Sequence, residues 1–254
     1  RIPVAHHGAD VFCDTVLISS EVAALTGHDE LVPTVTDDAA RALAERAEGE
    51  VFFCSVTAAP ALPLLGKLIL GNGLAGAFRF VKDRTAMMKG SSVRPPQGKA
   101  AAGVLKDFLV ALDEHLSDRE CMSGDDITYA DFCAYHPLWL ALSVGGLKSL
   151  QGFDHVQAWY ARMLDLGEGD RHEVDPEAAL ADVAGANPRD VPDSAVDHDD
   201  LGRTVSIAPS DYGRDGVDGV LAAVLDDRYI LARDTERCGA VHLHFPRKGY
   251  TVSS

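Results

Sequence analysis

The most informative stretch of the sequence is Thr128-Tyr129-Ala130-Asp131, followed by the apolar residues Phe132–Leu142. An acid three residues after a threonine is the pattern of a capping box. In such a box the Thr128 hydroxyl accepts from the Asp131 amide, and the Asp131 carboxylate reaches back to the Thr128 backbone. Because the following stretch is apolar on nearly all sides, it predicts a helix buried at the centre of a helical domain.

Helical patterns continue on both sides of this centre, from Thr36 to about Gly169. Thr36 is the predicted N-cap of a helix over Asp37–Glu48. Apolar residues at spacings of three and four predict two further amphipathic helices. The apolar face of the first consists of Leu105, Phe108, Leu109, Leu112 and Leu116, and that of the second of Val156, Trp159, Tyr160 and Met163. For Tyr135, His136 and Trp139 on the central helix, core packing is favoured over lining a substrate pocket.

The segment Gly71-Asn72-Gly73-Leu74-Ala75-Gly76 spells GxGxxG. A dinucleotide site would need a surrounding βαβ unit and an acid about twenty residues further on. Neither is present, so the segment is predicted to be a flexible loop or a broken helix.

The two ends of the chain show strand patterns. The first residues predict strand, turn, strand and helix, over Ile2–Ala5, His7–Asp10, Val11–Cys13 and from Asp14-Thr15 to a C-cap at Gly27. They are too few to bury a core alone. Residues 171–200 are rich in Asp, Ala and Pro and predict a solvated acidic linker with a short helix near Pro176–Val183.

The last fifty residues predict a small β-barrel, for which the strand number suggests an SH3-like form. Five short strand patterns, separated by turns, carry this expectation: Thr204–Ala208, Gly219–Val224, Arg228–Ala232, Ala240–Phe245 and Tyr250–Val252. His242 and His244 share one face of a strand. Since no nearby cysteine or acid completes a metal site, a polar strand face is favoured and no metal is expected.

Composition limits the classes of partner. The net charge is −16, and a surface this acidic repels phosphate backbones and anionic membranes, so neither nucleic acid nor membrane is an expected partner. No apolar run is expected to be long enough to span a bilayer. The five cysteines are scattered and show no CxxC spacing, which favours a reducing, cytoplasmic location.

Three places, in order, resemble the glutathione S-transferase superfamily. They are Arg1-Ile2-Pro3-Val4 with Cys13-Asp14-Thr15, then the Thr128–Asp131 box, and last the segments Ser210–Asp215 and Val241–Arg247, which resemble a small domain appended in a bacterial subgroup. The resemblance implies a mainly α protein with a partial thioredoxin-like α/β segment (1–27), the helical C-terminal domain (28–170), an acidic linker (171–200) and the small SH3-like β-barrel (201–254).

The resemblance also implies a glutathione site. Pro3 would be the cis-proline that opens the third thioredoxin strand, and the Ile2 backbone would pair with the cysteinyl part of glutathione. Asp14 and Thr15, at a helix N-terminus, would hold the γ-glutamyl end. The open alternative from these residues alone is that Pro3 merely ends a loop and Asp14-Thr15 is an ordinary N-cap.

The implied activity is attack of the glutathione thiolate on an apolar electrophilic small molecule, as in detoxification, by a possible homodimer. The family's catalytic Ser, Tyr or Cys follows the first strand, whereas this chain resembles the family from the third strand onward. The catalytic residue is therefore unknown, the chain is expected to be an N-terminal truncation that conjugates poorly, and Cys13 is expected to be a small core residue. The alternative is a non-catalytic binding or scaffold protein that acts through its C-terminal β domain.

Overall fold

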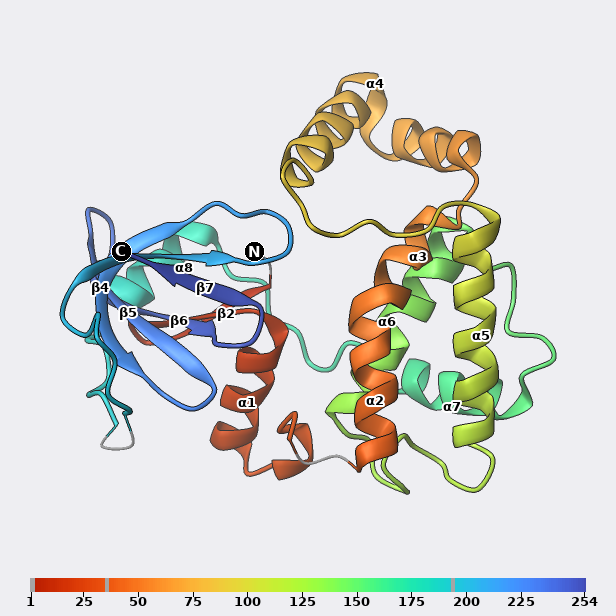
Figure 1. Ribbon diagram of the computed structural model, residues 1–254, viewed down its shortest axis with the longest axis horizontal. Coiled ribbons are helices and arrows are strands. Elements are labelled where there is room, and N and C mark those ends of the chain that lie inside the picture. The colour runs from red at the N-terminus through yellow and green to blue at the C-terminus, as the bar shows by residue number, and fades with distance from the viewer. Residues whose placement is uncertain (1–2, 35–36, 193–194) are drawn as a thin grey trace. The chain divides into compact units, whose positions relative to one another are not determined.

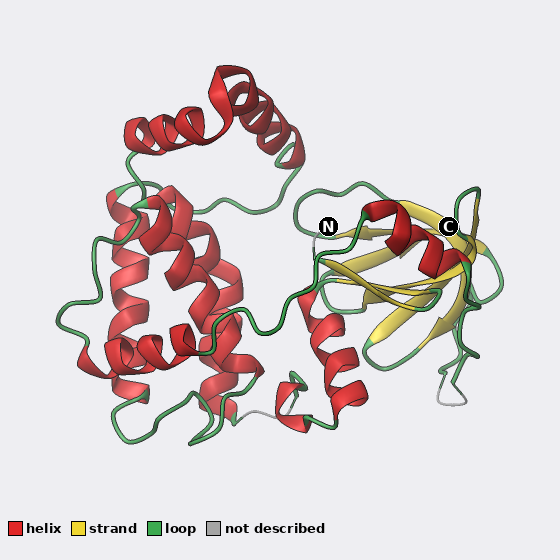
Figure 2. Cartoon of the chain, turned by 180° about the vertical axis from the view of Figure 1, so that it is seen from behind, coloured by secondary structure: helices red, strands yellow, loops and turns green. Residues whose placement is uncertain are grey.

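The computed structural model describes residues 3–34, 37–192 and 195–254, and the chain divides into two compact units. Unit 1 comprises Arg1–Leu25, Ala86–Val93 and Arg171–Ser254, and unit 2 comprises Thr26–Thr85 and Arg94–Asp170. All strands labelled in Figure 1 belong to unit 1, whereas unit 2 is helical (Figures 1 and 2).

Unit 1 is built on a seven-stranded sheet with the order β1-β2-β6-β5-β4-β3-β7. Its strands are β1 (Val4–His7), β2 (Asp10–Cys13), β3 (Thr204–Pro209), β4 (Val217–Val224), β5 (Arg228–Thr235), β6 (Gly239–Pro246) and β7 (Tyr250–Ser253), and its helices are α1 (Thr15–Thr26) and α8 (Pro176–Ala184). All seven predicted strands and both predicted helices are therefore present, with ends that differ from the predicted ones by at most three residues.

The N-terminal and C-terminal strands form one sheet. β2 pairs in parallel with β6, so that Asp10 lies opposite His242 and Phe12 lies opposite His244. This pairing differs from the predicted separation of residues 1–27 from residues 201–254, and the strand order does not confirm an SH3-like barrel. The pairing has a physical reason, because the backbone N–H and C=O groups on the free edge of β2 need hydrogen-bond partners and β6 supplies them.

One hydrophobic core joins the two ends of the chain in unit 1. It contains Cys13 from β2 together with Val205, Ile207, Leu221, Val224, Leu231, Phe245 and Tyr250 from the C-terminal strands. Cys13 is 9% exposed and packs in this core, in agreement with its expected role as a small core residue. The first strands thus bury their apolar side chains against residues more than 190 positions away.

Unit 2 is a helical bundle around α6. Its elements are η1 (Asp29–Leu31), α2 (Asp38–Arg46), the π-helical turn η2 (Ala47–Val51), α3 (Phe52–Thr57), most of α4 (Ala61–Met87), α5 (Lys99–His115), α6 (Tyr129–Val144) and α7 (Asp154–Asp165). The predicted apolar faces are buried through Leu105, Phe108, Leu109 and Leu112 on α5 and Val156, Trp159 and Met163 on α7. The prediction for His136 and Trp139 is wrong, because both are exposed on α6.

Side chains cap α2 and α6, two of the helices whose starts were predicted. Thr36, the expected N-cap of α2, lies outside the described residues; Asp37 is the N-cap, and its carboxylate accepts from the Ala40 amide at 2.8 Å. The capping box at α6 is present, and the Asp131 carboxylate reaches back to the Thr128 amide at 2.8 Å. The Thr128 hydroxyl adds a contact that was not expected, since it also donates to this carboxylate at 3.0 Å.

The helix α4 contains the GxGxxG segment. Gly73 has φ 68° and ψ 171°, so α4 consists of two helical segments joined at this residue, which is the predicted broken helix. By length and composition alone, Ala61–Met87 is long and apolar enough to cross a membrane. This corrects the expectation that no apolar run reaches that length, because the glycines interrupt the apolar pattern but helical hydrogen bonding resumes beyond them.

Candidate functional site

The candidate site is formed by the β1–β2 hairpin and the first residue of α1. Val4 lies opposite Cys13 in the hairpin register, which places Pro3 opposite Asp14. The Asp14 amide donates to the Pro3 carbonyl oxygen at 3.3 Å. The structure therefore brings together Pro3 and Asp14, two of the residues singled out by sequence, and Thr15 follows directly. Ile2, the fourth, lies outside the described residues.

Asp14 has an unusual backbone conformation. Its φ is 81°, and it is the sole non-glycine residue with positive φ among those described. Its carbonyl oxygen accepts from the Ile18 amide at 3.2 Å, so the chain turns from β2 into α1 at this residue within a single position. A non-glycine residue in this region costs about 1–3 kcal/mol and persists where the surroundings hold it, which is characteristic of ligand-binding positions.

The chemistry available here is recognition of a charged, extended ligand. Pro3 and Thr15 are exposed and Asp14 is half-buried. The N-terminus of α1 attracts anions such as a carboxylate, because the first amides of a helix have no partners within it. The Asp14 carboxylate provides the complementary group for an ammonium. A zwitterionic amino-acid group would satisfy both.

A site neighbour that sequence reasoning missed comes from the last strand. The Tyr250 hydroxyl, on β7, donates to Asp14 Oδ2 at 3.4 Å and lies 3.5 Å from Cys13 Sγ. Tyr250 is 6% exposed and its ring packs on Phe245 with centroids 5.8 Å apart. No local pattern in the sequence marks this tyrosine, since its role depends on a contact across 236 positions.

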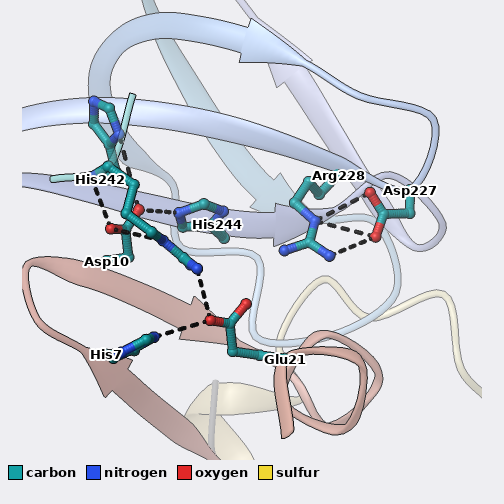
Figure 3. A network of polar contacts seen from close by, with 8 residues as sticks. His7, Asp10, Glu21, Asp227, Arg228, His242 and His244 are labelled. Carbon is teal, nitrogen blue, oxygen red and sulfur yellow. Dashed lines mark hydrogen bonds and ion pairs between the residues drawn. The ribbon is translucent and has the colours of Figure 1, made fainter. Parts of the chain in front are cut away.

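A polar network supports the hairpin beside the site (Figure 3). At its centre is Asp10, which is 1% exposed. Its Oδ1 accepts from His244 Nε2 at 2.7 Å, and its Oδ2 accepts from the Arg189 backbone amide at 3.0 Å and from Arg189 Nε at 3.2 Å. His242 Nδ1 lies 3.9 Å from Oδ1. Asp10 is therefore the acid that was not found near His242 and His244 in sequence.

The network continues to α1 and β1. Arg189 Nη1 donates to Glu21 Oε1 at 2.8 Å, and His7 Nδ1 lies 3.2 Å from the same oxygen. Arg189 also lies over the Phe12 ring, 5.4 Å from its centroid. The segment predicted as a solvated linker is thus anchored at Arg189, because the two buried or half-buried carboxylates need a cation.

The pKa values follow from these contacts. Burial alone would raise the pKa of Asp10, but the hydrogen bond from His244 and the contacts with Arg189 lower it to about 2. Burial would also raise the pKa of Glu21, but Arg189 and His7 outweigh it and lower that pKa. Burial lowers the pKa of His242, against the opposing field of Asp10. Asp10 and Glu21 are therefore charged at neutral pH, and the network ties β1, β2, α1 and β6 together.

Other reactive groups are the cysteines and the remaining His, Asp and Glu side chains. Among the described residues, no three His, Cys, Asp or Glu side chains are grouped to hold a metal ion, and all five cysteines are free thiols. In unit 2, Glu48 Oε1 accepts from the Tyr129 hydroxyl at 2.8 Å and from Cys133 Sγ at 3.3 Å. Burial first, and then Cys133 and Glu48, raise the pKa of Tyr129. Burial first, and then Glu48, raise the pKa of Cys133, so both groups stay protonated.

Comparison with known proteins gives a family match that lies mainly in unit 2. Residues 83–166 match the family model described as "Glutathione S-transferase, C-terminal domain". The match spans the end of α4, α5, α6 and α7. A search of curated proteins gave no match.

Solved structures extend the similarity to the whole chain. A GST-like protein from Pseudomonas syringae is 25% identical, with a TM-score of 0.73, over 100% of this chain and 82% of that one. Glutathione S-transferase III in its apo form is 20% identical over 76% of each chain, but its TM-score of 0.40 is too low to support an argument. Residues 83–166 thus match a glutathione S-transferase C-terminal domain, and the whole chain resembles a GST-like protein in fold, which together support the glutathione S-transferase superfamily.

Proposed function

We propose that the chain binds glutathione at Pro3, Asp14 and Thr15 and that the protein transfers glutathione, through its thiolate, to small apolar electrophiles. The observation that carries the proposal is the hydrogen bond from the Asp14 amide to the Pro3 carbonyl oxygen, at the start of α1. This contact sets an exposed strand end beside a helix N-terminus and a carboxylate, the combination that an extended γ-glutamyl peptide requires.

Each recognition group has a defined part in this proposal. The α1 amides and the Thr15 hydroxyl bind the γ-glutamyl carboxylate, and the Asp14 carboxylate binds the γ-glutamyl ammonium. Tyr250 holds the Asp14 side chain through its hydroxyl. The residues around Pro3 receive the cysteinyl backbone. The residue that activates the thiol is not assigned, since Cys13 is buried in the core of unit 1.

The test is a calorimetric titration of the whole chain with glutathione. Asp14→Asn removes the charge while keeping a side chain that tolerates positive φ. It is expected to weaken binding about 10- to 100-fold, because a hydrogen bond to a charged group contributes about 1.5–3 kcal/mol. Asp175→Asn is the matched control, because Asp175 is the N-cap of another helix of unit 1, α8.

Two results would overturn the proposal. One is a wild-type chain that shows no heat of binding with glutathione, and the other is an Asp14→Asn chain that binds as tightly as the Asp175→Asn control. Turnover is assayed separately with apolar electrophiles. Absence of conjugation there, with binding retained, would favour the non-catalytic binding alternative.

We also infer a cytoplasmic location and a homodimer. Five free thiols support the reducing compartment, and membership of a family that is often dimeric supports the assembly. Sedimentation velocity measures the second point directly: a monomer at micromolar concentration contradicts it.

A further inference from the structure

The surface of α4 combines exposed apolar side chains with basic ones. The most exposed of its large apolar side chains are Leu62 (83%), Leu70 (89%), Leu74 (75%) and Phe78 (71%). In the most apolar 18-residue stretch of this helix, the buried share is 6%. A monomeric soluble protein rarely leaves a contiguous apolar surface of this kind uncovered, so such surfaces mark sites of protein or membrane interaction.

The charge of α4 is opposite to that of the chain. It carries four basic residues, Lys67, Arg79, Lys82 and Arg84, against the single acid Asp83, in a protein whose net charge is −16. All four cations are exposed. The repulsion of anionic surfaces inferred from the total charge is therefore reversed locally at α4, because exposed charges further away than about one Debye length are screened.

The break at Gly73 decides how α4 can meet a bilayer. It divides α4 into residues 61–72 and residues 74–87 (Figure 1). Each segment is shorter than the roughly 20 residues that a spanning helix needs. In the second segment Leu74, Phe78 and Val81 recur at spacings of four and three and therefore share one face, with Arg79 and Lys82 beside it. Short apolar faces flanked by basic residues are suited to lie in the membrane interface.

We propose that α4 is a docking surface for an anionic lipid membrane, on which Leu74 and Phe78 enter the interface and Arg79 and Lys82 contact the lipid headgroups. A second copy of the chain is the competing occupant. In a two-fold symmetric dimer through α4, however, the same basic surface would face itself. An anionic bilayer satisfies both the charge and the apolar side chains.

Vesicle sedimentation of the whole chain tests the proposal. The chain is expected to sediment with phosphatidylcholine vesicles that contain phosphatidylglycerol, and not with phosphatidylcholine alone. Added salt should weaken the binding. Arg79→Gln with Lys82→Gln is expected to lower the partition coefficient about fivefold for each charge removed, whereas Lys106→Gln, an exposed change on α5, should not.

The apolar contact needs its own variant. Leu74→Asp is expected to reduce binding to the anionic vesicles at least about tenfold, while the control Val110→Asp, at a residue 50% exposed on α5, leaves it unchanged. Circular dichroism and sedimentation velocity are recorded for every variant, so that loss of folding is separated from loss of binding.

Three outcomes would overturn the proposal: no binding to anionic vesicles, equal binding to neutral and anionic vesicles, or equal loss in folded Leu74→Asp and Val110→Asp. A wild-type dimer that Leu74→Asp converts to a monomer, without any vesicle binding by either form, would assign α4 to a second copy instead.

Discussion

Asp131→Asn should strongly destabilise unit 2, although it changes one atom. Asp131 is fully buried and its carboxylate accepts four hydrogen bonds. Oδ1 accepts from the Met122 amide and Trp159 Nε1, both at 2.8 Å, and Oδ2 accepts from the Thr128 amide and hydroxyl at 2.8 and 3.0 Å. One side chain therefore connects the loop before α6, the start of α6 and α7.

The magnitude follows from the donors left without an acceptor. An asparagine keeps one oxygen and places an NH₂ group against the two donors on the other side. Each buried donor that loses its acceptor costs about 1–3 kcal/mol. Since the Thr128 hydroxyl can rotate away and the Thr128 amide cannot, we expect a loss of about 3 kcal/mol in the free energy of unfolding.

Urea unfolding, followed by helical circular dichroism and by fluorescence, measures this loss. Asp37→Asn is the matched control: it makes the same chemical change at the N-cap of α2, where the side chain is 44% exposed and asparagine caps as well as aspartate. Its expected cost is a few tenths of a kcal/mol. If Asp131→Asn falls within about 1 kcal/mol of this control, the donor count does not determine the stability of unit 2 and the reasoning is refuted.

Three further predictions concern stability and binding. Asp10, with its pKa near 2 in the folded chain and an ordinary value of 3.8, should contribute about 2 kcal/mol above pH 4 that is lost as the pH falls through 2; Asp10→Asn should flatten this acid limb in urea unfolding across that range. Gly146→Ala should lower the free energy of unfolding by at least about 2 kcal/mol, because the new Cβ meets the Ser55 carbonyl oxygen. Its control, Gly103→Ala, has open space in α5 and should raise that free energy by up to about 1 kcal/mol. Equal unfolding midpoints for the two variants would contradict this. Tyr250→Phe, which removes the hydroxyl from the candidate site, should weaken glutathione binding several-fold in calorimetry, with the unfolding midpoint as control.

The helices and strands were largely predictable because their signals are local. The capping residues before α6, the apolar spacing on α5 and α7 and the β-branched runs after residue 200 each lie within one element. The same holds for Asp14-Thr15, where a strand pattern passes directly into a helix pattern. These features depend on neighbours within a few positions, for which the period of side-chain orientation is enough.

The connections between distant segments were not predictable. The parallel pairing of β2 with β6 joins residues more than 230 positions apart and brings Asp10 to His244. The contact of Tyr250 with Asp14 spans 236 positions. A local pattern states that a strand edge needs a partner but not which strand supplies it. The exposure of α4 could not be predicted for a related reason, because an apolar helix has the same sequence whether or not other parts of the protein pack over it.

The helical domain and the strand-rich ends followed from the sequence alone, because hydrogen bonds and side-chain periodicity within one element set them. The candidate residues Pro3, Asp14 and Thr15 followed from a family resemblance. The folded chain was needed to show that the two ends share one sheet, that Arg189 anchors the acidic segment and that Tyr250 contacts Asp14. Those contacts arise when buried charges and open strand edges find partners across the fold, and the choice among possible partners is made by the packing of the whole unit.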